Sequence, residues 1–144
     1  MENKRLFGKI CYVHRQMLRE NNKIPFKYGV TPVQLRTLVF VHVQSLNGVK
    51  VCQKDIENHL NLRPSSVSSL ISNLENDGFL VRGTDEDNAR KKHIELTEKG
   101  KEVCKEDKKM MDECDGIVQS ALNEEEQSEF AVLLDKIVEK IERR

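Results

Sequence analysis

Residues 51–100 read VCQKDIENHLNLRPSSVSSLISNLENDGFLVRGTDEDNARKKHIELTEKG. The first half of this stretch predicts two short helices, because apolar residues recur at helical spacing on both sides of a turn at residues 61–63. Pro64 suits the first position of the second helix, where a missing backbone N–H costs nothing. The apolar stripe of that second helix consists of Val67, Leu70, Ile71 and Leu74. The stretch therefore opens with a helix-turn-helix.

The second half of the stretch predicts a two-stranded hairpin. Residues 79–82 and 91–96 are short β-prone runs, and the polar residues 83–90 between them are typical of a loop. Helix, turn, helix and hairpin in this order predict a winged helix-turn-helix. The expected fold class is mainly α with a small β-hairpin wing (α+β).

Two helices are predicted before this stretch. The first covers residues 4–21, and a connector containing a proline and a glycine follows at residues 21–30. Thr31 caps the second helix and forms a capping box with Gln34, and this helix stops at Asn47.

Two more helices follow the hairpin. Thr97 caps one that reaches about residue 121, and Asn123 opens another whose first turn is acidic. Each of these end helices has one apolar face, so each needs a surface to cover it.

Composition favours such an arrangement. Of the 144 residues, 38% are hydrophobic and 33% charged, and the mean hydropathy is -0.60, which is typical of amphipathic helices that bury one face against a second subunit. No apolar run approaches the ~18 residues of a membrane span, and the N-terminus lacks a signal-peptide core. We expect a cytoplasmic protein without membrane association. Its four cysteines lack CxxC spacing and are expected to be reduced.

The zero net charge hides a gradient. Residues 1–47 hold 8 basic and 2 acidic side chains, residues 48–101 hold 9 of each, and residues 102–144 hold 7 and 13. The basic first segment and the acidic last one are expected to attract each other. The neutral middle segment weakens the case for nucleic-acid binding.

The helix that begins at Pro64 carries five serines within residues 65–72, although serine is unfavourable inside a helix. Short hydroxyl side chains allow a helix to approach phosphates and base edges in a major groove about 12 Å wide. The polar side predicted to contact DNA comprises Ser65, Ser66, Ser68, Ser69 and Asn73. The alternative is a solvated face on which serines are tolerated.

Basic residues flank this helix. Arg90, Lys91 and Lys92 start the second strand, where an arginine on a projecting ribbon can enter a narrow minor groove. Lys54 and Arg63 are the other predicted DNA contacts. The acidic residues 85–87 oppose DNA unless they turn away or orient Arg90, and a mixed-charge hairpin is alternatively plain surface.

The ordered motifs resemble the MarR family of winged helix-turn-helix transcriptional regulators over essentially the whole chain. The resemblance is carried by Thr31-Pro32-x-Gln34, Gln53-Lys54-Asp55-Ile56, Leu74-Glu75-x-x-Gly78-Phe79-Leu80-x-Arg82, Asp85, Arg90 and Leu96-Thr97-x-x-Gly100. It implies a homodimer formed by residues 1–30 and 99–144, with a DNA-binding domain at residues 31–98. It further implies a repressor of a pseudo-palindromic operator that is released by a small ligand or an oxidant.

Such regulators often bind small aromatic anions between the dimerisation and DNA-binding regions. The residues that could line this cleft are His14, Arg15, Met17, Arg36 and Phe40, although methionine and phenylalanine at helical spacing are more often core. The family's peroxide-sensing branch has a reactive cysteine near the N-terminus, where this chain has Cys11. A buried, inert thiol is the favoured interpretation of Cys11.

The chain departs from the family pattern at three places. Ser69 and Asn73 stand where lysine or arginine is frequent, Asn88 replaces an aspartate before the wing arginine, and Arg63 takes a capping position. Fewer cations predict weaker DNA binding with a shallower salt dependence.

Other chemistry is not indicated. The sequence has no HExxH, no zinc-type Cys–His spacing, no phosphate-binding loop and no nucleophile elbow, so we expect no enzyme, metal or cofactor. The main alternative function is a winged-helix protein-interaction module with little or no DNA binding.

Overall fold

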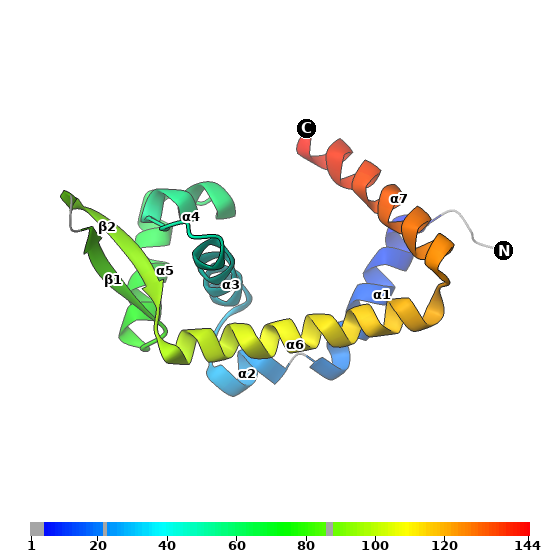
Figure 1. The fold of residues 1–144 in the computed structure, drawn as a ribbon, viewed down its shortest axis with the longest axis horizontal. Helices are drawn as coiled ribbons and strands as arrows, with labels where there is room; N and C mark the ends of the chain where they lie inside the picture. Colours follow the sequence, from blue (N-terminus) through cyan, green and yellow to red (C-terminus); the bar gives the residue numbers. More distant parts are fainter. Residues whose placement is uncertain (1–4, 22, 86–87) are drawn as a thin grey trace. The chain divides into compact units, whose positions relative to one another are not determined.

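The computed structural model describes residues 5–21, 23–85 and 88–144, leaving aside the side chains of residues 20, 21, 23, 25, 26, 84, 85 and 88–91. The elements, in chain order, are α1 (Leu6–Asn21), α2 (Lys23–Tyr28), α3 (Pro32–Leu46), α4 (Gln53–Leu60), α5 (Pro64–Asn76), β1 (Leu80–Asp85), β2 (Asn88–Leu96), α6 (Glu98–Ala121) and α7 (Glu124–Glu142) (Figure 1). The chain divides into two compact units, residues 1–107 and 108–144. The expected fold class, mainly α with a β-hairpin wing, is confirmed.

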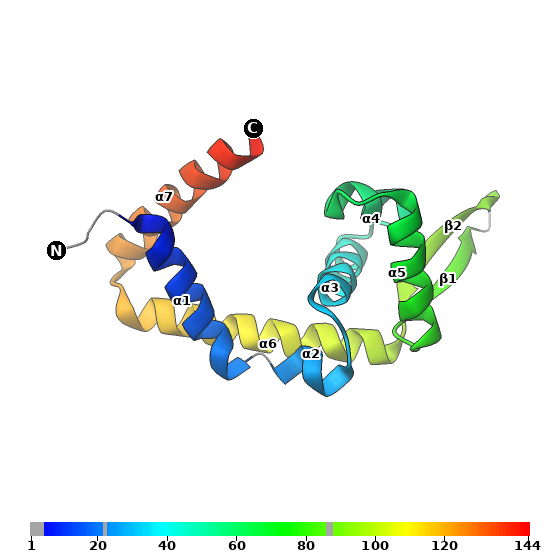
Figure 2. The same ribbon diagram turned by 180° about the vertical axis from the view of Figure 1, so that it is seen from behind.

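The core of the first unit joins the helix-turn-helix to the hairpin. In both ribbon views α5 lies alongside β1 and β2, with α4 and α3 on its other side (Figures 1 and 2). Fully buried side chains come from α3, α4, α5 and the start of the hairpin, and β2 adds the buried Ile94. The fully buried ones include Leu38, Val41, Ile56, Val67, Ile71, Leu74, Phe79 and Leu80. Burying each such side chain contributes about 1.5–3 kcal/mol, more than a typical helix cap. Packing of the predicted apolar stripes therefore holds the helix-turn-helix and the hairpin together.

Local capping starts α3 and α7 where the sequence predicts, and it also starts α4. The Gln34 backbone N–H donates to Thr31 Oγ1 at 3.2 Å, and the Thr31 N–H donates to Gln34 Oε1 at 2.8 Å. Asn123 and Glu126 form the same reciprocal pair at the start of α7, at 2.9 Å each. At α4, where cysteine is a poor cap, Asp55 supplies the capping group and accepts from the Cys52 N–H at 2.9 Å.

The tight turn between α4 and α5 depends on one backbone conformation. Asn61 has φ 52°, in the left-handed region that asparagine tolerates better than most residues. Its N–H still bonds back to Glu57, so the last carbonyls of α4 are satisfied while the chain reverses.

The hairpin is longer than predicted. The loop expected at residues 83–90 is wrong for residues 83–85 and 88–90, because β1 continues to Asp85 and β2 begins at Asn88, with an irregular register between Thr84 and Asp85. Residues 86–87 lie outside the described residues. A ribbon is held by its backbone ladder, and polar side chains do not prevent that pairing. Val51 adds an isolated bridge to Ile94, which ties the hairpin to the segment before α4.

The connector predicted at residues 21–30 is also wrong in part, because Lys23–Tyr28 forms the short helix α2. Pro25 lies in its first turn, where no helical backbone donor is lost, and Gly29 ends it with φ 65°. Ile24 is buried, and Lys27 Nζ lies 2.6 Å from Glu106 Oε1 of α6. These tertiary contacts make a helix of a segment whose composition is typical of a turn.

The second unit consists of the later part of α6 and all of α7. Gln127 Nε2 donates to the Leu122 carbonyl at 2.8 Å and to that of Gln119 at 3.3 Å, which secures the turn between these helices. No residue of α7 is buried. None of the helices in the described part of the chain is long and apolar enough to cross a membrane.

Candidate nucleic-acid interface

The polar side of α5 is accessible. Its apolar stripe is buried as predicted at Val67, Ile71 and Leu74, with Leu70 half-buried. Of the predicted contact residues, Ser65, Ser66, Ser69 and Asn73 are exposed, and Ser68 is half-buried. The helix thus offers hydroxyl and amide groups along one open side, which is what contact with a DNA groove requires.

The predicted cations around α5 differ in their availability. Arg63 is exposed at the N-cap of α5 and makes no capping hydrogen bond with its side chain, and Lys92 on β2 is exposed. Arg90 and Lys91 lie in β2, but their side chains are outside the described part of the structure. Lys54 is solvent-accessible, yet its Nζ lies 3.2 Å from Glu57 Oε2. Part of the positive charge near α5 is therefore neutralised within the protein.

Glu57 is a buried carboxylate that sequence analysis missed. Its side chain is only 9% exposed and accepts from Lys54 and, at 3.2 Å, from Gln53 Nε2. Gln53 Nε2 also lies 3.3 Å from the Pro64 carbonyl, so these contacts connect the start of α4 to the start of α5. The helical spacing of Gln53 and Glu57 was the available signal, since residues four apart lie side by side on a helix.

Arg82 was noted in the sequence only as part of a motif. In the structure Arg82 Nε donates to Glu75 Oε2 at 3.0 Å, and Nη2 donates to Ser72 Oγ at 3.1 Å. This links β1 to the last turns of α5. No sequence signal pairs these residues, because the side of β1 that faces α5 depends on how the hairpin packs.

The base of the hairpin is attached to the start of α6. Thr97 Oγ1 donates to the Gly78 carbonyl at 2.6 Å, and the Thr97 N–H donates to the Phe79 carbonyl at 3.1 Å. Lys99 Nζ donates to the Asp77 carbonyl at 2.8 Å and lies 4.3 Å from the centre of the Phe79 ring. Thr97 was predicted as a helix cap, and it does accept from the Gly100 N–H, but it also anchors the wing.

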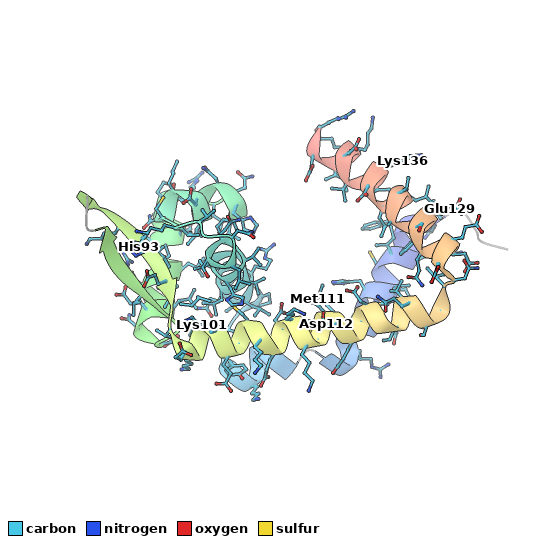
Figure 3. The ribbon with its side chains drawn as sticks, in the orientation of Figure 1. His93, Lys101, Met111, Asp112, Glu129 and Lys136 are labelled. Carbon is cyan, nitrogen blue, oxygen red and sulfur yellow. The ribbon has the colours of Figure 1, made fainter. Side chains whose placement is uncertain are left out.

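A hollow of about 310 Å³ lies beside β2, lined in part by His93, Lys50 and Lys101. Figure 3 shows His93 on the hairpin and Lys101 near the start of α6. His93 Nε2 lies 2.8 Å from Glu95 Oε1, and the ring occupies the space that a Cβ at Gly83 would fill. The pairing of Gly83 with His93 across the ladder explains why a small residue suits this strand.

The predicted ligand-lining residues have varied environments. His14, Arg15 and Arg36 are exposed, and Met17 is half-buried. Phe40 stacks on His59 of α4, with ring centres 4.0 Å apart and an angle of 14° between the planes. His59 was not among the predicted residues. A shared cleft for the five predicted residues stays a prediction.

The cysteines are all free. Cys104 is buried, and burial raises the pKa of its thiol to about 12. The expectation that Cys11 is buried is wrong for the single chain, in which Cys11 is exposed on α1. In the described part of the chain, no three His, Cys, Asp or Glu residues are grouped as metal ligands.

Comparison with known proteins agrees with this geometry. Residues 28–91 match the model of the MarR family. The chain carries a MarR-family winged helix. It is similar to S. aureus MepR in a MepR–DNA complex, at 26% identity and a TM-score of 0.70, covering 94% of this chain and 97% of that one.

Two further solved structures extend the likeness. S. aureus MepR bound to ethidium bromide is 25% identical, with a TM-score of 0.73 and 98% and 97% coverage. The transcriptional regulator Tm0710 from Thermotoga maritima has a similar fold, at 24% identity and a TM-score of 0.64, with 97% and 94% coverage. No curated protein sequence matches the chain significantly. The chain therefore has the fold of MarR-family transcriptional regulators along nearly its full length.

Proposed function

We propose that this MarR-family chain is a dimeric regulator that binds duplex DNA at a pseudo-palindromic operator. It represses transcription there until a small ligand or an oxidant releases it. The observation that carries the proposal is the open polar side of α5 beside the wing, with Ser65, Ser66, Ser69 and Asn73 exposed. A similar structure is that of MepR in complex with DNA.

The electrostatics of this surface set the expected strength of binding. Arg63 and Lys92 are exposed, and Arg90 and Lys91 belong to the same strand as Lys92. Glu57 neutralises Lys54, and Glu75 neutralises Arg82. Each phosphate neutralised by a cation adds about 0.9 to the slope of log affinity against log salt. A shallow slope is therefore expected, with hydrogen bonds from α5 contributing more than counterion release.

Dimerisation is supported by apolar side chains that one chain leaves uncovered. On α7 they include Phe130, Leu133, Leu134, Ile137, Val138 and Ile141, and on α1 Leu6, Phe7, Ile10 and Val13. A contiguous exposed apolar stripe in a protein with a mean hydropathy of -0.60 indicates a contact surface. Helix α1 lies within residues 1–30 and α7 within residues 99–144, the two segments that we assign to dimerisation.

Gel shifts against random and upstream genomic duplexes test DNA binding. We expect salt-sensitive retardation, and selection of bound duplexes from a random pool should return two half-sites related by a two-fold axis. Absence of binding to every duplex would sink the proposal. Selection of a single asymmetric site would support DNA binding but exclude binding as a symmetric dimer.

Sedimentation of a charge-insertion variant tests the dimer. Ile137→Glu places a carboxylate in the apolar stripe of α7 and should produce monomers. Lys136→Glu changes the neighbouring, exposed position and should stay dimeric (Figure 3). Equal sedimentation of Ile137→Glu and the unchanged chain would exclude this face from the dimer contact.

Release by a ligand is supported by the solved structure of MepR with ethidium bromide. We place the candidate cleft at His14, Arg15, Met17, Arg36 and Phe40. Titration of ethidium, of an aromatic carboxylate and of peroxide into the DNA complex distinguishes a cationic ligand, an anionic ligand and an oxidant. If none of the three dissociates the complex, these modes of release are excluded.

A protein-interaction module remains the second candidate, because residues 48–101 have no net charge and, in the described part of that segment, Lys54, Arg82 and Lys101 are paired with carboxylates. The same gel shifts discriminate, since such a module would bind every duplex weakly or not at all, even at low salt.

A further inference from the structure

Arg82 occupies a junction between the wing and the helix proposed to enter the DNA groove. It lies on β1 opposite Ile94. This pair is two residue pairs along the ladder from Leu80 and Leu96, which pair at the base of the hairpin. Its guanidinium donates to Glu75 at 3.0 Å and to Ser72 at 3.1 Å. These two acceptors are three residues apart on α5, so they lie on the same side of the helix.

From this geometry we infer that Arg82 is a positioning residue that sets the angle of the wing relative to α5. It acts on DNA binding through Glu75 and Ser72, without contacting DNA. This inference rests on the proposed function, because it assigns the arginine a role within the same DNA-binding surface. Arg82 was not among the residues predicted to contact DNA, and the sequence indicated no other role for it.

The wing needs such a contact because a two-stranded ribbon is only marginally stable by itself. The buried Phe79 and the hydrogen bonds of Thr97 hold the base of the ribbon, whereas Arg82 ties its side to α5. From Arg82 to Asp85 the strand extends about 10 Å, so a tilt of about 10° at Arg82 would move Asp85 by about 2 Å. A shift of that size breaks a hydrogen bond.

An arginine suits this role better than a lysine. Its planar guanidinium fixes the directions of its donors, and here two different nitrogens serve two different acceptors. The charged pair is 30% and 41% exposed, so its own contribution to stability is small. The expected effect of the pair is therefore on geometry, and the free energy of unfolding should change little.

Neutralising Glu75 gives opposite results for the two possible roles of Arg82. If the arginine contacts a phosphate, Glu75→Gln frees it and removes a repelling charge, so binding should tighten. If Arg82 positions the wing through Glu75, the same change should weaken binding despite the more favourable net charge. Asp77→Asn is the matched control, since it removes one carboxylate just beyond the end of α5.

The experiment measures duplex affinity against salt concentration for the unchanged chain, Arg82→Ala, Arg82→Lys, Glu75→Gln and Asp77→Asn. We expect Arg82→Ala and Glu75→Gln to lose about tenfold in affinity, as for one charge-assisted hydrogen bond. Arg82→Lys should recover little, and Asp77→Asn should bind equally or slightly more tightly. The salt slope should stay the same in Arg82→Ala.

Two results would overturn the inference. One is unchanged or tighter binding by Glu75→Gln, and the other is a salt slope that falls by about one in Arg82→Ala, which marks a lost phosphate contact. Circular dichroism and thermal unfolding test whether each variant is folded. If Arg82→Ala does not fold, the result for Glu75→Gln decides the outcome.

Hydrogen exchange of residues 80–96 tests the positioning without DNA. Arg82→Ala and Glu75→Gln should accelerate exchange in the hairpin and leave that of α3 unchanged. Equal exchange rates in the hairpin would refute the inference. If the unchanged chain binds no duplex while the hairpin exchange accelerates as expected, the proposed function fails and the positioning of the wing stands.

Discussion

Gly100, in the first turn of α6, lies so close to the backbone of Phe79 that a Cβ atom at position 100 would overlap the Phe79 carbonyl oxygen. The same carbonyl accepts from the Thr97 N–H at 3.1 Å. Both Gly100 and Phe79 are buried. The missing side chain therefore lets α6 begin directly against the base of the wing.

The substitution Gly100→Ala should lower the free energy of unfolding by about 2–3 kcal/mol, because the added methyl group meets rigid backbone. Gly116→Ala is the control in the same helix, where a Cβ meets nothing within 4 Å. It should raise stability by about 0.5–1 kcal/mol through helix propensity. Urea unfolding measures the free energy of unfolding of both variants. Equal changes in the two variants would refute the close contact of position 100 with the Phe79 backbone as the cause.

Adding a cation to the exposed side of α5 should strengthen DNA binding. Asn73→Arg places a positive charge on that side, so the affinity should rise and the salt slope should steepen by about one. Gln119→Arg adds the same charge to the second unit and should change the slope little. Gel shifts across a salt series provide the measurement. A slope for Asn73→Arg equal to that of the unchanged chain would remove this side of α5 from the DNA contact.

The wing arginine is expected to reach a groove. Arg90→Ala should weaken duplex binding by about 1–3 kcal/mol, whereas Lys140→Ala on α7 should have little effect. Fluorescence anisotropy with the selected duplex measures both affinities. Unchanged binding by Arg90→Ala would mean that the wing tip does not take part.

Asp107 should make stability depend on pH, because burial raises the pKa of its carboxyl above the usual 3.8. The folded state then binds the proton more tightly than the unfolded state. The resulting stability is present below the unfolded pKa and is lost as pH rises through the folded pKa. Asp107→Asn should therefore raise the Tm at about pH 7, and its advantage should shrink towards about pH 4.

Asp112→Asn is the control for that measurement, since Asp112 is exposed and lies 2.8 Å from Lys108 Nζ (Figure 3). Its removal should lower the Tm slightly or leave it unchanged at neutral pH. An advantage of Asp107→Asn that does not vary with pH would exclude titration of Asp107 as its cause.

Thiol labelling should separate the cysteines. With a pKa of about 12, Cys104 carries a thiolate fraction on the order of 1 in 100,000 at neutral pH, and burial also blocks the reagent. Labelling of Cys104 should follow unfolding, and urea should make it fast. Mass spectrometry of labelled peptides gives the rate for each site. Labelling of native Cys104 as fast as that of the exposed Cys11 would contradict its burial.

The sequence by itself determined the features that depend on residues close together in the chain. The capping pairs at Thr31 and Asn123 stand three residues from their partners, and both form as predicted. The apolar stripe of α5 follows from helical spacing alone, so its buried side and its polar side were both predictable. The order of helix, turn, helix and hairpin then follows from these local signals.

Only the tertiary structure decided what depends on residues far apart in the chain. The helix at residues 23–28 is held by the packing of Ile24 and by Glu106, and the strands extend because the backbone ladder continues through polar residues. The roles of the cations were decided in the same way. Arg82 bonds to Glu75 because the hairpin packs beside α5, and a contact across two packed elements leaves no periodic pattern in the sequence.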